Sequence, residues 1–378
     1  MRLGDCGKTN LHTYSDKEKW SLIRYLDTGS ITEGRIDEIQ TLYPGVDKIP
    51  SRARRKASVG DILFSTVRPN QKHFGIIEAG TENLLVSTGF AVVTVDATIA
   101  DPYFIYYYLT QSSVIESLQA IAEQSTSTYP SIKPSDIEDI ELDLPALETQ
   151  KKIGSTLRML DRKIALNEEI NDNLMQQAVT IFKSWFVEYS PFDGIEPKEW
   201  ETVNLEKITS LISRGIAPKY SDNSDQIVIN QKCIRNHMID LSQARTHTPK
   251  VINEKWLRFG DLLINSTGDG TLGRAAQVWF QPQNITVDSH VTVVRPAKEN
   301  LIFYIGLWGV LHEREIESLH TGSTGQTELP KERVKALELH LPDNGTLDRF
   351  NTLIAPMAAA IVSKQNENNK LATLRDAL

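Results

Sequence analysis

The feature that most constrains the fold is a long amphipathic helix pattern that occurs twice, 197 residues apart. In each copy the seam positions follow alternating steps of four and three, which is the spacing of a coiled coil. The first set is Ile153, Leu157, Leu160, Ile164, Asn167, Asn171, Leu174, Ala178, Ile181 and Trp185. The second is Phe350, Ile354, Met357, Ile361, Lys364, Asn368, Leu371, Arg375 and Leu378. Nine matched positions indicate that both helices follow one template.

Both copies place polar residues at the same two seam positions. These are Asn167 and Asn171 in the first helix and Lys364 and Asn368 in the second. A polar residue at a seam costs stability but fixes register and pairing. Two independent amphipathic surface helices would be the simpler alternative. A long rod with one apolar stripe needs a partner, however. We therefore expect the two helices to pack antiparallel about an approximate two-fold axis, with Asn167 near Asn368 and Asn171 near Lys364.

Shorter segments repeat at nearly the same interval, so the duplication extends beyond the helices. VGDILFS (59–65) is matched by FGDLLIN (259–265), and IELDLP (140–145) by LELHLP (337–342). Short strands with glycine and proline between them are expected in each copy, with one helix near 103–122 or 301–319. The predicted fold is α+β, with mixed α/β domains at 1–145 and 191–342. Long helices follow them at 146–190 and 343–378 and pack as an antiparallel coiled coil with pseudo-two-fold symmetry.

The composition is that of an ordinary soluble protein, with 40% hydrophobic and 24% charged residues. Two cysteines exclude a disulfide framework and favour a reducing cytoplasm. No apolar run approaches the roughly 20 residues of a membrane span, so no membrane role is expected. The net charge of −8 does not indicate a nucleic-acid partner, although only a local basic face matters for that partner.

Motifs that would indicate catalysis are not matched in their required context. GDGTLG (268–273) fits a dinucleotide-binding pattern, but RAAQVWF follows it and alternates like a strand, which predicts a hairpin loop. DPYF (101–104) reads as a helix start, with Asp101 as the cap and Pro102 at the first helical position. No histidine or cysteine pair has metal-ligand spacing, and there is no Walker loop. We expect no catalytic residue, no metal site and no cofactor bound by this chain.

Candidate DNA contacts in the first copy lie in three places. The dense basic run before the first GD strand suits phosphates, although a solvated loop would look the same. TVRPNQKHFG (66–75) follows that strand and carries side chains that read base edges in the major groove. EQSTSTYPS (123–131) is rich in hydroxyl groups. The candidates are Arg52, Arg54, Arg55, Lys56, Arg68, Asn70, Gln71, Lys72, Gln124, Ser125 and Tyr129.

In the second copy, STGDGTLGR and HTGSTGQTE (320–328) occupy the equivalent positions with different sequences. Two loops that recognise different DNA sequences would differ in this way, and so would two surface loops whose sequences have diverged. The candidates are Thr267, Asp269, Thr271, Arg274, Ser323, Thr324 and Gln326.

Over nearly its whole length the chain resembles the specificity subunit of type I restriction-modification enzymes. The resemblance rests on the GDIL and GDLL strands, the STSTYPSI and GSTGQTEL turns, the two junctions into the long helices, and LRMLDRKIALNEEINDNL. LPALETQKKIGSTLRMLDRKI is very similar to the family's junction into its central helix. The second junction departs from the family, with DNGTLDRF where a proline and Glu-Gln are usual. The first copy also lacks the tryptophan segment EWETVNLEKI that opens the second.

The resemblance implies two target recognition domains, each of which reads one half of a bipartite site in double-stranded DNA. It implies that the helices set the gap and dock two methyltransferase subunits, which use S-adenosylmethionine. Restriction and translocase subunits would join through the complex, and ATP and magnesium would act only in the partner subunits. The alternative from a different class is a coiled-coil adaptor or assembly protein that does not bind DNA, which the acidic net charge favours.

Overall fold

The computed structural model describes residues 1–15, 17–80, 82–125, 129–322 and 327–378. The chain forms two compact units. Unit 1 consists of Met1–Arg162 together with Leu374–Leu378, and unit 2 consists of Lys163–Thr373. Each unit combines one of the predicted globular segments with part of both long helices. In the described residues no helix is both long and apolar enough to cross a membrane.

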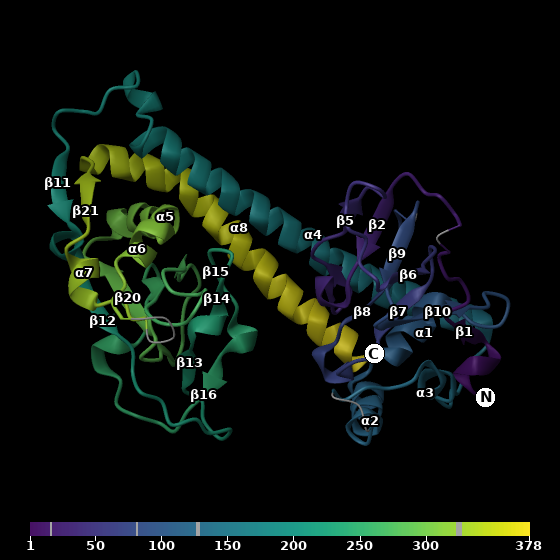
Figure 1. Ribbon diagram of the computed structural model, residues 1–378. Coiled ribbons are helices and arrows are strands. Elements are labelled where there is room, and N and C mark those ends of the chain that lie inside the picture. The colour runs from purple at the N-terminus through teal and green to yellow at the C-terminus, as the bar shows by residue number, and fades with distance from the viewer. Residues whose placement is uncertain (16, 81, 126–128, 323–326) are drawn as a thin grey trace. The chain divides into compact units, whose positions relative to one another are not determined.

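The elements below keep the labels of Figure 1. The strands of unit 1 are β1 (Gly7–Thr9), β2 (Ile23–Leu26), β3 (Ile31–Thr32), β4 (Arg35–Ile36), β5 (Gln40–Leu42), β6 (Ala53–Lys56), β7 (Ile62–Ser65), β8 (Phe74–Ile76), β9 (Leu84–Ser87) and β10 (Phe90–Val95). Its shorter helices are α1 (Pro102–Leu109), α2 (Ser112–Glu123) and α3 (Pro134–Glu138). The strands of unit 2 are β11 (Glu201–Asn204), β12 (Thr209–Arg214), β13 (Ile227–Ile229), β14 (Ile234–Arg235), β15 (Met238–Ile239), β16 (Arg245–Thr246), β17 (Leu262–Asn265), β18 (Ala275–Gln277), β19 (Ile285–Val287), β20 (Val291–Pro296) and β21 (Glu338–Leu341). Its shorter helices are α5 (Ile302–Leu311), α6 (Glu313–Ser318) and α7 (Lys331–Lys335), and the long helices are α4 (Leu147–Phe186) and α8 (Asn344–Ala377).

Unit 1 contains two four-stranded sheets, in the orders β1-β10-β7-β8 and β5-β2-β9-β6. Strand β7 is buried on both faces, because alternate side chains enter different cores. Ile62 and Phe64 pack with the helices α1 and α2, whereas Leu63 packs with residues of β2 and β9. This explains why the strand reads as a continuous apolar run.

Unit 2 repeats this topology, which confirms the predicted duplication and the mixed α/β fold. Its main sheet has the order β12-β20-β17-β18, strand for strand the order of the first unit. Its second sheet, β16-β13-β19, contains one antiparallel and one parallel pair, which match the pairs β5-β2 and β2-β9 of unit 1. The strand β6 has no counterpart in this second sheet of the described chain. The equivalent region contains a short 3-10 helix, Asn253–Lys255.

The single helix expected in each copy is in fact two helices. The predicted start is correct, since the Asp101 carboxylate accepts a hydrogen bond from the Phe104 amide at 2.9 Å. The helix then breaks at Thr110 and Gln111 before α2 begins, and α5 and α6 are similarly separated at His312. The strand expected at 140–144 is reduced to one antiparallel bridge between Arg2 and Glu141, whereas its counterpart β21 pairs with the whole of β11.

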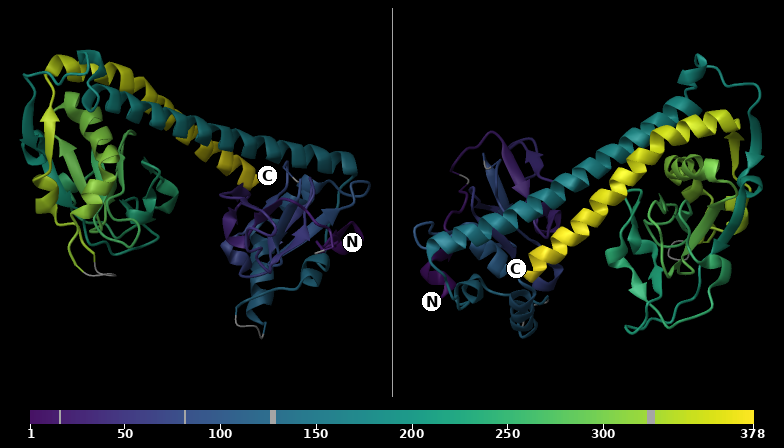
Figure 2. Two further views of the ribbon diagram at one scale, coloured as in Figure 1. Left: turned by 45° about the horizontal axis from the view of Figure 1, so that its top comes forward. Right: turned by 180° about the vertical axis from the view of Figure 1, so that it is seen from behind.

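The helices α4 and α8 run antiparallel and lie side by side in Figures 1 and 2. With 40 and 34 residues they are about 60 and 50 Å long. In unit 2 the rings of Phe186 and Phe350 lie 4.8 Å apart between centroids. In unit 1 Arg375 donates a hydrogen bond to Asp161 at 2.8 Å. As residue numbers rise along α4, the numbers of the residues that face them on α8 fall, so the two helices keep one register.

Glu78 is one of the residues that hold unit 1 against its part of α4. Glu78 accepts hydrogen bonds from Arg158 and Arg162 at 2.9 Å each and from the Tyr103 hydroxyl at 3.0 Å. Partial burial acts to raise the pKa of Glu78, but these three donors outweigh it and hold the pKa down at about 2. The Arg158 guanidinium also lies 4.3 Å from the centre of the Tyr103 ring. The carboxylate therefore joins the domain to α4 within unit 1.

Candidate nucleic-acid interface

The loop between β7 and β8 holds its candidate residues in a defined conformation. A short 3-10 turn, Pro69–Gln71, is flanked by Arg68 and Lys72, which have φ values of 49° and 57°. Left-handed backbone at non-glycine residues costs free energy and persists where the surroundings impose it. Here the Arg68 amide donates to the Pro130 carbonyl at 2.9 Å. The loop is thus tied to the predicted turn at 123–131.

Arg68 and Tyr129, predicted from separate segments, are brought together. The guanidinium carbon lies 5.0 Å from the centre of the tyrosine ring. The backbone amide of Asn70 donates to the Gln119 side chain at 3.2 Å, which anchors the loop to α2. Asn70 and Gln71 are exposed. The arrangement presents a cation, an aromatic ring and two exposed amide side chains on one loop cluster, and these are groups that read base edges and phosphates.

Lys72 is held by a neighbour that the sequence reasoning missed. Its ammonium group pairs with Glu33 at 2.5 Å, and the Glu33 amide donates to the Lys72 carbonyl at 2.9 Å. Glu33 lies in the turn between β3 and β4 and also has a positive φ. The only local sequence feature that could have indicated this contact is the Glu-Gly turn at 33–34. Because its charge is matched by this carboxylate, Lys72 is a weaker candidate for phosphate than Arg68.

The basic run at 52–56 is not a loop, because residues 53–56 form the strand β6. Arg52 lies outside this strand, and the register of the strand shifts between Ala53 and Arg55. Lys56 forms an ion pair with Glu18 and lies 5.3 Å from the centre of the Trp20 ring. Arg55 is half-buried, and burial lowers the pKa of its guanidinium. Arg52 is exposed and Arg54 is half-exposed, so these two remain the accessible members.

Gln124 and Ser125 follow the end of α2. Gln124 is exposed, and the Ser125 hydroxyl accepts a hydrogen bond from the Ser131 amide at 3.3 Å. The serine therefore closes the turn that carries Tyr129, whereas the glutamine side chain points to solvent.

In unit 2 the corresponding loop joins β17 to β18, which pair antiparallel. GDGTLG is therefore a hairpin loop, as predicted. The loop is closed on itself, since Arg274 donates to the Gly270 carbonyl at 2.9 Å and the Thr271 hydroxyl to the Thr267 carbonyl at 3.4 Å. Asp269 is exposed at its tip. The second loop thus presents a carboxylate where the first presents amides.

Four residues that the sequence reasoning missed support this second loop. The Thr267 hydroxyl lies 2.7 Å from Nδ1 of His290 and 3.4 Å from Oε1 of Gln231. Thr267 also bridges Glu328, which forms an ion pair with Arg214 at 2.6 Å. No local pattern marks these contacts, because they join distant segments. The candidates Ser323, Thr324 and Gln326 lie outside the described residues.

The polar layer of the helix pair is partly as predicted. Asn167 is fully buried, and its Nδ2 donates to Asn368 Oδ1 at 2.8 Å and to Glu367 at 3.0 Å. Asn368 in turn donates to the Ile164 carbonyl at 3.2 Å. Asn171 is buried too, but its Oδ1 has no partner in the described part of the chain. Lys364 pairs with Glu367 on its own helix at 3.1 Å. The predicted Asn167–Asn368 pair is therefore present, and no hydrogen bond joins Asn171 to Lys364 among the described residues.

Comparison with known proteins identifies the family. Residues 53–176 and 197–355 match the type I restriction modification DNA specificity domain, once in each copy, and the chain belongs to this family. It is 32% identical over 215 residues to the type I restriction enzyme HindI specificity subunit of Haemophilus influenzae, a match that covers 55% of this chain and 46% of that protein. It is 25% identical over 344 residues to the MjaIX specificity subunit of Methanocaldococcus jannaschii, which covers 84% of this chain and 76% of the relative. The chain thus spans about half of the first relative and three quarters of the second.

A solved structure agrees at the level of the fold. The type I restriction-modification system S subunit from M. genitalium aligns with all of this chain and 93% of its own, with a TM-score of 0.58 and 13% identity. Such a likeness supports the architecture of duplicated domains and long helices, and the resemblance seen in the sequence is confirmed as membership of the specificity-subunit family.

Proposed function

We propose that this chain is the DNA-reading subunit of a type I restriction-modification complex, and that each unit reads one half of a bipartite site in double-stranded DNA. The observation that carries the proposal is the pair of loops β7–β8 and β17–β18. They occupy the same place in two units of the same topology, yet they present different side chains. Two loops at equivalent positions that carry different side chains are what the recognition of two different DNA sequences requires.

The first loop offers Arg68, Asn70 and Gln71, which suit guanine and adenine edges in the major groove. The second offers Asp269, which suits the amino group of cytosine, and Thr271. Arg54 lies on β6 in the neighbouring sheet of unit 1, Arg52 precedes that strand, and both suit phosphates. The acidic net charge of the chain is compatible with this role, because the contacts are local.

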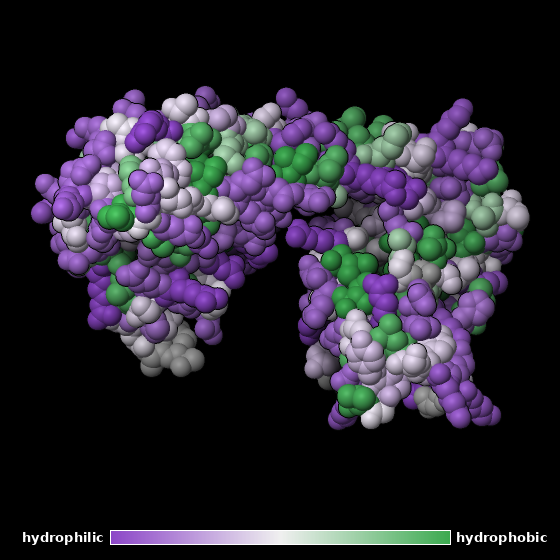
Figure 3. Space-filling model, turned by 90° about the horizontal axis from the view of Figure 1, so that it is seen from above, coloured by the Kyte–Doolittle hydropathy of each residue, from purple (hydrophilic) through white to green (hydrophobic). Residues whose placement is uncertain are grey.

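The helix pair would set the gap between the half-sites and dock two methyltransferase subunits. Its exposed side includes large apolar side chains, among them Met159 at 62% exposure and Leu166 at 50%, which lie two turns apart on one face of α4. Figure 3 shows such apolar surface between polar regions along the long helices. We propose that S-adenosylmethionine, ATP and magnesium act in the partner subunits, including a restriction and translocase subunit, and that this chain supplies no catalytic group. With allowance for tilt and domain width, we expect a rod of about 50 Å to set the half-sites roughly 10 to 14 base pairs apart.

The test is a titration of duplex binding against salt, with the methyltransferase subunit present. A DNA reader shows a steep negative slope of log affinity against log salt, whereas a protein adaptor shows none. Replacing Arg52 with Ala should reduce the slope by about one counterion for all sequences. Lys48→Ala, which removes an equal charge at an exposed position nearby, is the matched control. A flat salt dependence in the wild type would exclude the proposed function.

A further inference from the structure

Unit 2 carries an arginine stacked on a tyrosine outside the loop β17–β18. Arg245 lies on β16, and its guanidinium carbon is 3.8 Å from the centre of the Tyr220 ring. Both side chains are exposed. Among the described residues no carboxylate forms an ion pair with Arg245. An arginine that lies on a ring keeps its N–H edge available, so the pair presents a bidentate donor at the surface.

The backbone around the pair is fixed by hydrogen bonds. Tyr220 forms an antiparallel bridge with His247. The Thr246 hydroxyl donates to the Ser221 carbonyl at 2.6 Å, and the Ser221 amide donates to the Thr246 carbonyl at 3.2 Å. The segment that carries the ring is therefore tied to the strand that carries Arg245.

Arg245 lies on the outer face of the sheet β16-β13-β19. It pairs with Val228, and residues that pair directly point to the same side of a sheet. Ile227 and Ile229, which flank Val228, point to the opposite side and pack with the core that the main sheet shares. Arg245 therefore points away from that core, where it meets the Tyr220 ring.

One set of contacts connects this pair to the candidate loop β17–β18 along the backbone. Nδ2 of Asn230 donates at 2.9 Å to the carbonyl of Gln243, two residues before Arg245. The next residue, Gln231, accepts a hydrogen bond at its carbonyl from the side chain of Asn265 at 3.1 Å. Asn265 is the last residue of β17. The start of β16 is thus joined to the point where the loop leaves its strand.

A second set of contacts leads from Tyr220 to the same loop. Burial raises the pKa of the Tyr220 hydroxyl, and the negative charge of Asp288 adds to the rise. Asp288 accepts a hydrogen bond from the His290 amide at 2.9 Å, and Nδ1 of His290 lies 2.7 Å from the Thr267 hydroxyl. The stacked pair therefore stands beside the loop that presents Asp269.

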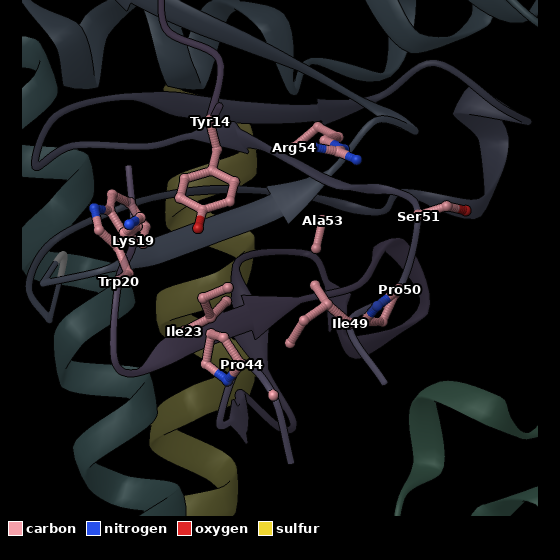
Figure 4. A pocket seen from close by; sticks show the side chains of 11 residues that line it. Tyr14, Lys19, Trp20, Ile23, Pro44, Ile49, Pro50, Ser51, Ala53 and Arg54 are labelled. Atoms are coloured by element: carbon pink, nitrogen blue, oxygen red, sulfur yellow. The ribbon is translucent and has the colours of Figure 1, made fainter. Parts of the chain in front are cut away.

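The position of Arg245 has a counterpart in unit 1. The pairing of β16 with β13 and of β5 with β2 places Gln40 where unit 2 has Arg245, and Gln40 is also exposed. Over the corresponding face of unit 1, Tyr14 and Trp20 line a pocket instead (Figure 4). A phosphate contact common to both units would favour a cation at both positions. An amide in one unit and a guanidinium in the other are instead the groups that read adenine and guanine.

We propose that Arg245 reads a guanine of the half-site that unit 2 recognises, with its guanidinium plane held by Tyr220. Donation from arginine to O6 and N7 of guanine is the commonest specific contact in the major groove. Arg274, the arginine within the loop, is used to close the loop on Gly270, which leaves this role to Arg245. The inference rests on the proposed function and adds to it a specificity-determining residue outside the matched loops.

The test uses the full-length chain assembled with its methyltransferase subunit. Binding is measured to duplexes in which each base pair of the mapped site is replaced in turn. For the wild type, replacement of one G·C pair in the half-site of unit 2 should weaken binding about 5- to 150-fold, the range of a good bidentate contact. Arg245→Ala should abolish the discrimination at this position and leave every other position unchanged. Arg245→Lys, which keeps the charge but lacks the planar fork, should lose most of it.

Variants of the ring separate positioning from charge. Tyr220→Leu should reduce the discrimination at the same position by a smaller factor, and Tyr220→Phe should preserve it, because it keeps a ring beneath the guanidinium. Arg258→Ala is the matched control and should leave every position unchanged. Arg258 is an exposed arginine of the same unit, and it precedes β17 at the end opposite the loop.

The half-site of unit 2 is the one that Arg68→Ala leaves unaltered. Equal weakening of all sequences by Arg245→Ala would assign the residue to a phosphate and overturn the proposal. An unchanged profile, or a half-site of unit 2 that contains no G·C pair, would overturn it as well. In each of these cases the wild type keeps its steep salt dependence, so the proposed function stands. A flat salt dependence of the wild type would remove both.

Discussion

Replacement of Asn171 by leucine should stabilise unit 2, although it removes a buried polar residue from a helix pair. Asn171 is 2% exposed, and its Oδ1 has no hydrogen-bond partner among the described residues. An unsatisfied buried acceptor costs about 1–3 kcal/mol. Leucine removes that acceptor and supplies the apolar side chain that a seam position favours. We therefore expect the free energy of unfolding to rise by about 1–3 kcal/mol.

The matched variant is Asn167→Leu, at the other polar seam position of the same helix. The Oδ1 of Asn167 also has no hydrogen-bond partner in the described part of the chain, so replacing it likewise removes an unsatisfied buried acceptor. However, the substitution removes the 2.8 Å hydrogen bond to Asn368 and leaves the Asn368 oxygen without that donor. The loss offsets the gain by about 1–3 kcal/mol. Asn167→Leu should therefore be close to neutral or destabilising.

Differential scanning calorimetry of the full-length chain measures both variants against the wild type. For a unit of about 200 residues, each kcal/mol moves the Tm by about 2–4 °C. The Tm of Asn171→Leu should thus exceed that of Asn167→Leu by several degrees, with analytical ultracentrifugation to detect wrong assembly of the leucine variants. Equal shifts in the two variants, or a fall in Tm for Asn171→Leu alone, would show that the hydrogen bonds of the layer do not determine its stability.

Three further outcomes follow from the structure. Arg68→Ala should alter methylation of one half-site only and Arg274→Ala the other only, as read by sequencing of modified DNA; a variant that rewrites both halves would contradict independent reading. A second variant has four residues inserted after position 162 in α4 and four after position 373 in α8, where the same unit boundary falls. The insertions should lengthen the spacer by ~6 Å, or roughly two base pairs, and leave the half-site sequences unchanged. An unchanged spacer with activity retained would mean that the helices do not measure the gap. Because the pKa of Glu78 is lowered from 4.5 to about 2, its contribution is complete above pH 4.5 and is lost as pH falls toward 2. Glu78→Gln should therefore lower the stability of unit 1 at pH 7 by about 1 kcal/mol, after allowance for solvent screening, and flatten its acid unfolding curve; unchanged acid unfolding would contradict this.

The repeated and locally encoded features could be predicted from the sequence. The seam steps placed both long helices, and the alternation of RAAQVWF identified the hairpin at 268–273 although a glycine motif suggested otherwise. Both patterns are periodic within one segment, so no distant residue is needed to interpret them. The cap at Asp101 is equally local.

The features that escaped prediction depend on residues far away in the chain. Residues 54–56 are charged, and the segment 53–56 has little preference for a strand, yet β6 forms because β9 pairs with it. Glu33, Gln119 and His290 reach the candidate loops only after the fold is complete. The break before α2 is a different case. Ser112 and Ser113 are of a residue type that favours helix starts, but the apolar pattern on both sides of them predicted one continuous helix.

The assignment of Leu374–Leu378 to unit 1 has a consequence for how the protein is made. Tyr107 and Arg375 both donate to Asp161, at 2.6 and 2.8 Å. About 200 residues of unit 2 are synthesised between Asp161 and Arg375. At roughly 5–20 residues per second, the ribosome needs some 10–40 s to synthesise unit 2, and only then can unit 1 acquire the contact between Asp161 and Arg375. The unit whose synthesis begins first therefore remains incomplete until the second unit has been made, and a nascent chain that stops before Arg375 would lose this contact.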